Sequence, residues 1–353
     1  MMWDDIVRAA SGIVETPVQA GTNSEASQHE PQSQDRKRSG LRIGLALGGG
    51  AARGWSHIGV LRALIREGVE PDVVTGASIG AVVGGCYVAG KLDELEDFAR
   101  SLTTRRVLGL LDFKLGASGL IGGDRLRQLL EEHLGDRRIE DQQLDFTAIA
   151  TECATGHEIW LSRGRMVEAI RASYALPGII DPVRIRNRLL IDGSLVNPIP
   201  ITTARARGAD LVICVNLNGD ARFNGATIQS LGHEDEDEDE DAVLEAATRR
   251  TGLLGAVLGA PDRPRNGRSS RHNGPGLARV MIDAFNITQD RIARSRLAGD
   301  PPDLMISPKL SKIGLFDFQK AAESIALGEE AATRALPDLR ELLDEAGALA
   351  DPD

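Results

Sequence analysis

Residues 72–90 read DVVTGASIGAVVGGCYVAG, and the change of pattern within this stretch indicates the fold. Residues 72–76 are short and rich in β-branched side chains, which predicts a buried strand. Residues 79–89 form an apolar run that predicts a buried helix, and Gly90 is a typical helix stop. A buried strand that leads directly into a buried helix is typical of a parallel sheet covered by helices.

The turn between these two elements carries the first chemical signal. Gly76-Ala77-Ser78-Ile79-Gly80 matches the pattern G-x-S-x-G in the strand-to-helix setting that this motif requires. In that setting the serine hydroxyl stands above the sheet edge, and the amides that begin the helix face any oxyanion that forms there. The motif therefore predicts Ser78 as a nucleophile. Taken alone, it also fits a serine that only caps the helix.

A second glycine-rich turn follows the apolar run RIGLAL at residues 42–47. Residues 48–54 read GGGAARG. A dinucleotide-binding turn would need glycine where this chain has Arg53, and the Gly-Lys-Ser/Thr of a phosphate loop is missing. We therefore interpret the turn as a loop whose backbone amides point at a carbonyl oxygen. Arg53 either locks this loop or attracts an anionic headgroup.

A third motif, Asp192-Gly193-Ser194, ends another predicted strand. A serine nucleophile needs a base, which is usually a histidine oriented by a carboxylate. After the motif only His233 and His272 occur, and both lie in low-complexity sequence. His57 precedes the nucleophile, and we expect it to make a structural contact. The economical solution is a dyad in which Asp192 takes the proton of Ser78 directly.

The remaining chain alternates between strand and helix patterns, which predicts an α/β fold with a mainly parallel central sheet. Strands are expected at 145–152, 158–162, 188–192, 210–218 and 303–307, and helices at 52–67, 92–102, 124–134, 163–174, 201–208, 277–297 and from about 317 onward.

The expected domain organisation is one folded domain over residues 41–340. Residues 1–40 are polar without periodicity, so we expect a disordered leader, and residues 341–353 are expected to form a tail. Residues 219–275 contain an acidic run and a basic tract, and we expect a disordered low-complexity insertion in a surface loop.

The composition excludes several functional classes. The net charge of the 353 residues is -11, but eight consecutive acids at 234–241 account for most of it, and aromatic residues are only 3%. Such a chain has neither a basic footprint nor a stacking surface for nucleic acid. We expect no nucleic-acid partner, and no feature of the sequence identifies a protein partner.

The sequence also predicts the absence of metal and cofactor sites. Cys86, Cys153 and Cys214 are far apart, so they are interpreted as buried small hydrophobic residues in a reducing compartment. No Asp/Glu/His cluster has metal-ligand spacing, so no metal and no cofactor are expected. The start of the chain lacks a secretory signal, and no run is a convincing membrane span, which favours a cytoplasmic protein.

Together these motifs resemble the patatin-like phospholipase family, in particular its bacterial members. The resemblance covers residues 41–217 and 277–335 and rests on six segments: GGGAARGWSHIGVLRAL (48–64), GASIG (76–80), TECATG (151–156), RASYALPGIIDPV (171–183), DGS (192–194) and SPKLSKIGLFDF (307–318). One departure concerns the acid motif, whose third residue is usually Gly or Ala in the family and is Ser194 here. Serine is small, so we expect the dyad to be retained.

The resemblance implies a three-layer α/β/α patatin-like fold and metal-independent hydrolysis of lipid carboxylic esters, of the phospholipase A, lysophospholipase or esterase type. Ser78 would be the nucleophile and Asp192 the base. The oxyanion hole would comprise the amides of Gly48, Gly49, Gly50 and Ile79. The supporting residues would be Arg53, Gly54, Gly76, Gly80 and Gly193.

The implied partner is a lipid or lysophospholipid substrate, reached through peripheral contact with the inner membrane face. Two other classes of function are carried as alternatives. The first is a weakly active adaptor that reuses the fold for protein contacts, for which the acidic insertion would be suited. The second is a nucleotide-binding protein that uses the glycine loop.

Overall fold

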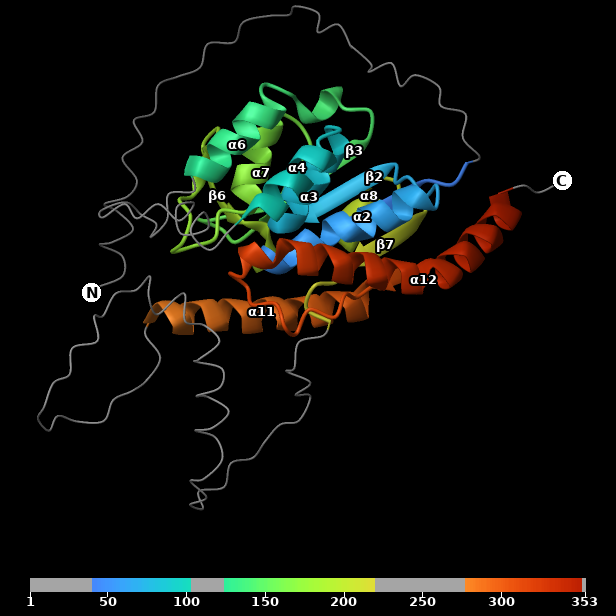
Figure 1. The fold of residues 1–353 in the computed structure, drawn as a ribbon. Coiled ribbons are helices and arrows are strands. Elements are labelled where there is room, and N and C mark those ends of the chain that lie inside the picture. Colours follow the sequence, from blue (N-terminus) through green and yellow to red (C-terminus); the bar gives the residue numbers. More distant parts are fainter. Residues whose placement is uncertain (1–39, 103–123, 220–276, 351–353) are drawn as a thin grey trace, which may run out of the picture. The chain divides into compact units, whose positions relative to one another are not determined.

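The computed structural model describes residues 40–102, 124–219 and 277–350 (Figure 1). At the centre of these ranges lies an eight-stranded sheet of order β5-β6-β3-β2-β1-β7-β8, in which β4 also pairs with β3. The strands are β1 Ile43–Leu47, β2 Val73–Ala77, β3 Asp145–Glu152, β4 Glu158–Leu161, β5 Val183–Ile185, β6 Arg188–Asp192, β7 Leu211–Val215 and β8 Leu304–Ile306. In the spatial order β3-β2-β1-β7-β8, each pair of neighbouring strands is parallel. The strands β4 and β6 run antiparallel to β3, and β5 runs antiparallel to β6.

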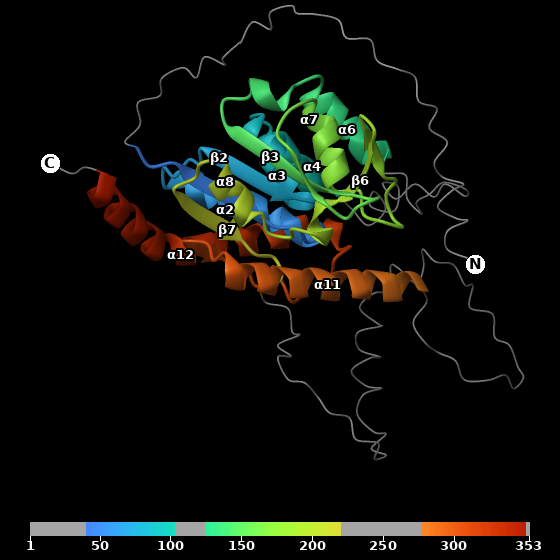
Figure 2. The same ribbon diagram turned by 180° about the vertical axis from the view of Figure 1, so that it is seen from behind.

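Helices cover both faces of the sheet, as opposite views show (Figures 1 and 2). The α-helices are α2 Ser56–Arg66, α3 Ile79–Val88, α4 Leu92–Ser101, α6 Asp124–Leu134, α7 Met166–Ser173, α8 Ile201–Ala206, α11 Leu277–Gly299 and α12 Ala321–Ala350. Short 3-10 helices are η1 Ala51–Trp55, η2 Ile139–Asp141, η3 Gly193–Leu195 and η4 Phe318–Lys320.

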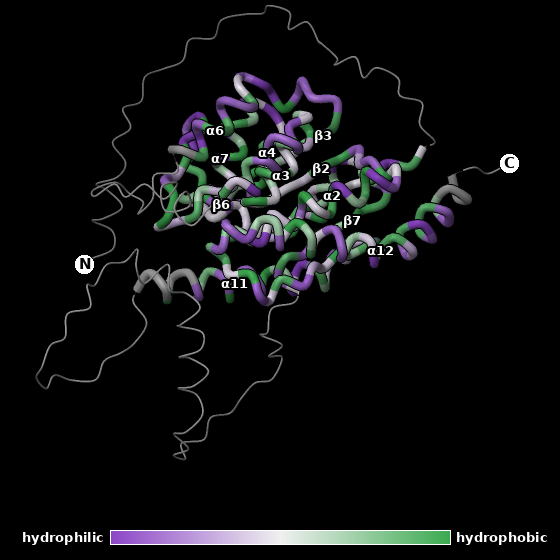
Figure 3. Tube along the Cα trace, viewed as in Figure 1, coloured by the Kyte–Doolittle hydropathy of each residue, from purple (hydrophilic) through white to green (hydrophobic). Residues whose placement is uncertain are grey.

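Side chains alternate between the two faces of the buried strands because successive residues of a strand point in opposite directions. In β1, Leu45 and Leu47 belong to the large core under α2, α3, α7 and α12. Ala46 belongs to a smaller core that contains residues of α8 and Ala293 of α11. This division confirms the predicted three-layer α/β/α arrangement. In Figure 3, hydrophobic segments lie along β7 and its neighbouring helices, and they alternate with hydrophilic ones along α11 and α12.

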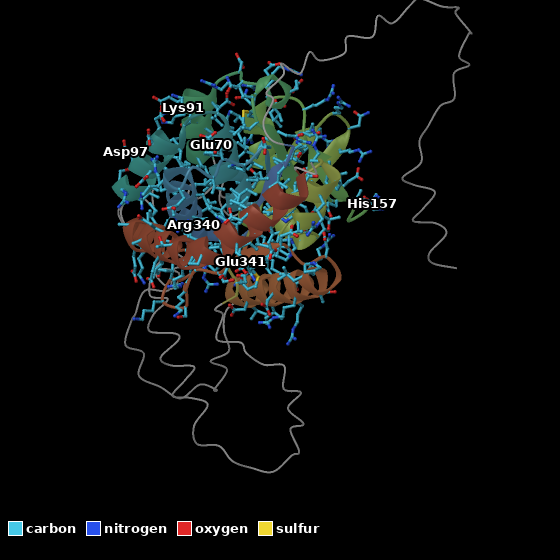
Figure 4. The ribbon with its side chains drawn as sticks, turned by 90° about the vertical axis from the view of Figure 1, so that its right-hand side faces the viewer. Glu70, Lys91, Asp97, His157, Arg340 and Glu341 are labelled. Atoms are coloured by element: carbon cyan, nitrogen blue, oxygen red, sulfur yellow. The ribbon has the colours of Figure 1, made fainter. Side chains whose placement is uncertain are left out.

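The crossing of α2 and α12 depends on two glycines that allow the helix backbones to meet. A Cβ at Gly59 would lie 1.9 Å from the Ile325 carbonyl oxygen, and one at Gly328 would lie 1.9 Å from that of Ser56. At the far end of the contact Arg340, which is labelled on α12 in Figure 4, pairs with Glu67. This packing holds η1, which directly precedes α2, against the C-terminal helix.

Most predicted elements are present with slightly shorter bounds. The strands expected at 145–152 and 188–192 are β3 and β6 without change, whereas the short strand β5 was not predicted. The expected tail at 341–353 begins inside α12, which continues to Ala350 because its apolar periodicity extends past residue 340. Apart from Gly40 and Gly219, the expected leader (1–40) and insertion (219–275) lie outside the described ranges.

Candidate active site

Ser78 lies on a sharp turn between β2 and α3. Its φ of 54° and ψ of -122° place a non-glycine residue in a backbone region that costs about 1–3 kcal/mol and is concentrated at functional sites. Glycine is required on both sides: a Cβ at Gly76 would lie 2.5 Å from the Gly80 carbonyl oxygen, and one at Gly80 would lie 2.1 Å from the Leu47 carbonyl oxygen. The turn therefore presses the start of α3 against the end of β1.

Asp192 is the last residue of β6, and its carboxylate lies near enough to the Ser78 hydroxyl for that hydroxyl to lower its pKa. The strand register explains how residues so distant in sequence meet. Ala77, just before Ser78, pairs with Ile149 on one side of β3, and Asp192 pairs with the next residue, Ala150. β4 occupies the other side of β3, so β2 and β6 lie end to end along one side of it. Because β6 runs antiparallel to β2, the C-terminal ends of the two strands meet there.

The carboxylate of Asp192 is buried, with only 1% of the residue exposed. Burial raises its pKa to about 6, because the charged form is desolvated. The Ser194 amide, which donates a hydrogen bond, and the nearby hydroxyls of Ser78 and Ser194 act in the opposite direction. The Ser194 amide donates to Oδ1 at 2.8 Å. Asp192 is thus a stronger base than a solvated aspartate, yet it remains mostly ionised at pH 7.

The glycine loop lies directly beside this pair. A Cβ at Gly49 would lie 2.1 Å from the Ser194 Oγ and 3.5 Å from the Ser78 Cβ, so a side chain there would displace the Ser194 hydroxyl. Behind the loop, Nε2 of His57 lies 2.8 Å from the Gly48 carbonyl oxygen. The loop is therefore held close to both members of the pair.

Two of the four amides predicted to form the oxyanion hole already have acceptors. The Gly48 amide donates to Val215 O at 3.2 Å, and the Gly49 amide donates to Pro198 O at 3.0 Å. Each amide has a single hydrogen, so the first attaches the loop to β7 and the second to the segment between η3 and α8. The amides of Gly50 and Ile79 make no such backbone hydrogen bond to the described residues, and they are the two that remain for a ligand.

Some of the residues predicted to support the glycine loop connect it to the segment 307–318. Nε of Arg53 donates to Ile313 O at 2.9 Å, and the neighbouring Ala52 amide donates to Leu315 O at 2.9 Å. Gly54 leaves room for the side chain of Ile79, because a Cβ at position 54 would lie 2.2 Å from that side chain. The segment 307–318 is therefore joined to the glycine loop by main-chain acceptors, and Arg53 makes part of this connection.

The sequence did not single out Ser173 at the end of α7. Its Oγ accepts a hydrogen bond from the Ser78 amide at 3.0 Å, and the carbonyl of nearby Ala175 accepts one from the Asp192 amide at 2.9 Å. The segment 171–183 thus contacts both members of the pair. The available signal was a small polar residue in an otherwise apolar helix face, which is too common to identify a contact from sequence.

The histidines do not form a triad with Ser78 in the described part of the chain. His57 is buried and bonds to Gly48, and burial lowers its pKa to about 4, so the imidazole is neutral at pH 7. His233 and His272 lie outside the described residues.

Among residues 40–102, 124–219 and 277–350 no group of three or more His, Cys, Asp or Glu could hold a metal ion. In the same ranges no helix is long and apolar enough to cross a membrane. Cys86 and Cys214 are buried as predicted, but Cys153 is exposed. The prediction for Cys153 is wrong because this residue follows β3 in the turn toward β4, outside the sheet.

Comparison with known proteins adds the family. A model of the patatin-like phospholipase family matches residues 45–205. An uncharacterized NTE family protein of Mycobacterium tuberculosis is 35% identical over 334 residues, which cover 85% of this chain and 93% of the relative. The chain belongs to the patatin-like phospholipase family. The match includes all three motifs described above.

Further family relatives are longer. The lysophospholipase NTE1 of Yarrowia lipolytica is 33% identical over 201 residues, which are 56% of this chain and 14% of that protein. Among solved structures, human GIVD cytosolic phospholipase A2 aligns with a TM-score of 0.40 and 14% identity, over 88% of this chain and 60% of the other.

Proposed function

We propose that this protein is a serine hydrolase that cleaves carboxylic esters of lipids, with Ser78 as nucleophile and Asp192 as its base. The observation that carries the proposal is the meeting of Ser78, on a strained turn, with the buried Asp192 carboxylate, beside a loop with unused amides. Family membership and the similarity to a lysophospholipase support a phospholipid or lysophospholipid as the substrate class.

In the first half-reaction Ser78 Oγ attacks the ester carbonyl carbon while Asp192 accepts the hydroxyl proton. The tetrahedral oxyanion is stabilised by the amides of Gly50 and Ile79. Collapse of the intermediate expels the alcohol, which takes the proton back from Asp192, and leaves an acyl group on Ser78. Water then attacks this acyl-enzyme with the same base, so that the fatty acid leaves and Ser78 regains its proton.

The electrostatics of the site suit this role. Base assistance contributes about 10²–10⁴ in rate, and each oxyanion donor about 10²–10³. A carboxylate with a pKa of about 6 takes a proton from a hydroxyl more readily than one with its ordinary value of 3.8. The contacts of Ser173 with the Ser78 amide and of Ala175 with the Asp192 amide hold the two reacting groups at a fixed separation.

The mechanism needs no metal, since the dyad activates the nucleophile and backbone amides stabilise the oxyanion. Hydrolysis should therefore persist in excess EDTA, with unchanged rate in added Ca²⁺. A large loss of activity in EDTA that Ca²⁺ restores would contradict this part of the proposal.

The decisive experiment measures fatty-acid release from lysophosphatidylcholine and from diacyl phosphatidylcholine vesicles, together with labelling by a fluorophosphonate probe. We expect release from at least one lipid and labelling of Ser78. The Ser78→Ala variant should show neither. A folded protein that neither labels nor releases fatty acid from these lipids or from short-chain esters would contradict the proposal.

A further inference from the structure

Ser194 stands out in the site because its hydroxyl is buried without a well-formed hydrogen bond. The residue is 0% exposed, and its Oγ has no partner of good geometry among the described residues. Buried hydroxyls almost always find an acceptor, because leaving one unpaired costs stability. The mechanism above gives this hydroxyl no role.

The surroundings restrict which acceptor the hydroxyl can reach. On one side lies Gly49, whose Cβ position would be 2.1 Å from Oγ and 3.1 Å from the Ser194 Cβ. The close approach of Gly49 leaves Ser194 fully buried, so its hydroxyl is closed off from solvent. The neighbouring acceptor is the carboxylate of Asp192, which already receives the Ser194 amide at 2.8 Å.

A carboxylate has about four acceptor positions, so it accommodates further donors. The Ser194 amide and the Ser78 side chain occupy two of these positions. The turn of η3 brings the amide and the hydroxyl of residue i+2 back toward the side chain of residue i, as in other local turns capped by aspartate. A small rotation about the Ser194 Cα–Cβ bond would complete the contact.

We propose that Ser194 is a positioning residue whose hydroxyl donates to the Asp192 carboxylate and holds it in place as the base for Ser78. The inference rests on the proposed function, because it assigns Ser194 a role through Asp192. Hydrogen bonds to a charged group favour its charged form. The hydroxyl thus keeps Asp192 ionised at lower pH than burial alone would allow, in agreement with the downward effect of the Ser194 side chain on the pKa of Asp192.

Other charges around Asp192 do not explain this effect. Charged side chains on the surrounding elements include Asp145 and Glu152 on β3, Glu158 on β4, Arg184 on β5, Arg188 on β6, Glu168 and Arg171 on α7, and Arg296 on α11. Glu152 pairs with Arg188, Glu158 with Arg296, and Glu168 with Arg165. None of them is among the causes that shift the pKa of Asp192, which are burial and the hydrogen bonds of Ser78 and Ser194.

The test is the pH dependence of kcat/KM for a soluble short-chain ester in Ser194→Ala and Ser194→Gly. Activity requires ionised Asp192, so kcat/KM rises with pH and levels off above its pKa. Loss of the donor raises that pKa, and the acidic limb should move to higher pH by about 1 pH unit. Inactivation by a fluorophosphonate should show the same displacement. Plateau activity should stay within a few-fold of the wild type.

Thr147→Val is the matched control. Thr147 also carries a buried hydroxyl without a partner among the described residues, but it lies farther down β3, opposite Thr75. Its variant should leave the limb in place. Two variants at position 194 guard against a folding defect in one of them, which a thermal melt would reveal.

Two results would overturn the proposal. If the acidic limb of the kcat/KM profile does not move and the plateau value is retained, Ser194 is only a packing residue. If the limb does not move and the plateau value falls more than tenfold, the hydroxyl acts at the oxyanion instead. Asp192→Asn separates this failure from that of the proposed function. If Asp192→Asn is inactive while the limb of Ser194→Ala is unmoved, only the role of Ser194 fails. If Asp192→Asn retains activity, the dyad itself is wrong.

Discussion

The imidazole of His57 holds the glycine loop from below, with Nε2 2.8 Å from the carbonyl oxygen of Gly48. The ring is buried and neutral at pH 7, and its Nδ1 has no partner within the described ranges. Nε2 therefore carries the proton and donates to Gly48. This contact fixes the loop without taking part in proton transfer.

Replacing His57 by Phe should remove the donor and keep most of the volume. We expect the loop to lose its position, with kcat lowered about tenfold and the acidic limb of the pH profile unmoved. His57→Gln can still donate and should recover part of the loss. Steady-state kinetics over pH would check this, and a displaced limb in His57→Phe would instead indicate that the imidazole exchanges protons with the dyad.

Ser78→Ala and Asp192→Asn should each abolish ester hydrolysis while the protein still melts cooperatively. The double variant should be no worse than either single one, because the two side chains act as a unit. Turnover of p-nitrophenyl esters provides the measurement. Asp145→Asn, at the opposite end of β3, is the control for loss of a carboxylate and should stay active. More than about a tenth of wild-type activity in either single variant would contradict the dyad.

Asp192 should also make the protein less stable at neutral pH. Its pKa is raised from 3.8 to about 6 in the folded state, so its stabilising contribution is present below pH 3.8 and is lost as the pH rises through 6. The Asp192→Asn variant cannot ionise at this position, so its stability does not fall in this pH range. Its free energy of unfolding at pH 7.5 should be higher than that of the wild type by up to about 3 kcal/mol. Urea titrations at pH 4 and 7.5 test this. A stability difference independent of pH would contradict the raised pKa.

Gly59→Ala should destabilise the protein strongly, because the added methyl group would lie 1.9 Å from Ile325 O and force α2 and α12 apart. Overpacking of this kind costs about 1–3 kcal/mol, and here a backbone atom is the obstacle. Gly299→Ala has open space around the new methyl group and serves as control. A thermal melt in which both variants equal the wild type would show that the helix contact is looser than described.

Replacement of residues 221–274 by a Gly/Ser linker of about 20 residues, with a mean span of roughly 25 Å, should leave turnover of a soluble short-chain ester within a few-fold. The reason is that α11, which follows the segment, is anchored independently by Arg296, whose guanidinium pairs with Glu158 at 3.0 Å. Lipid binding is the property to compare before and after the deletion. If the shortened protein melts cooperatively but has no esterase activity, the segment belongs to the site.

The elements next to the motifs could be predicted from sequence because their signals are local. The apolar run of β2, the glycines on both sides of Ser78 and the apolar helix α3 each depend on neighbours in the chain. The strand β5 was missed because its three residues carry too short a pattern to stand out. Similarly, Cys153 is exposed because β3 ends just before it, and the apolar residues near it in the sequence do not reveal where the strand ends.

The sequence by itself determined that strand-end turns carry a serine, an acid and a glycine loop, because steric limits on glycine and the periodicity of burial act over a few residues. Only the tertiary structure decided which groups in those turns are available. β2 and β6 pair end to end along the same side of β3, which brings Ser78 to Asp192. Contacts with Val215 and Pro198 occupy the amides of Gly48 and Gly49, whereas those of Gly50 and Ile79 are left. An amide's single hydrogen goes to whichever acceptor the fold brings near, and that acceptor is distant in the chain.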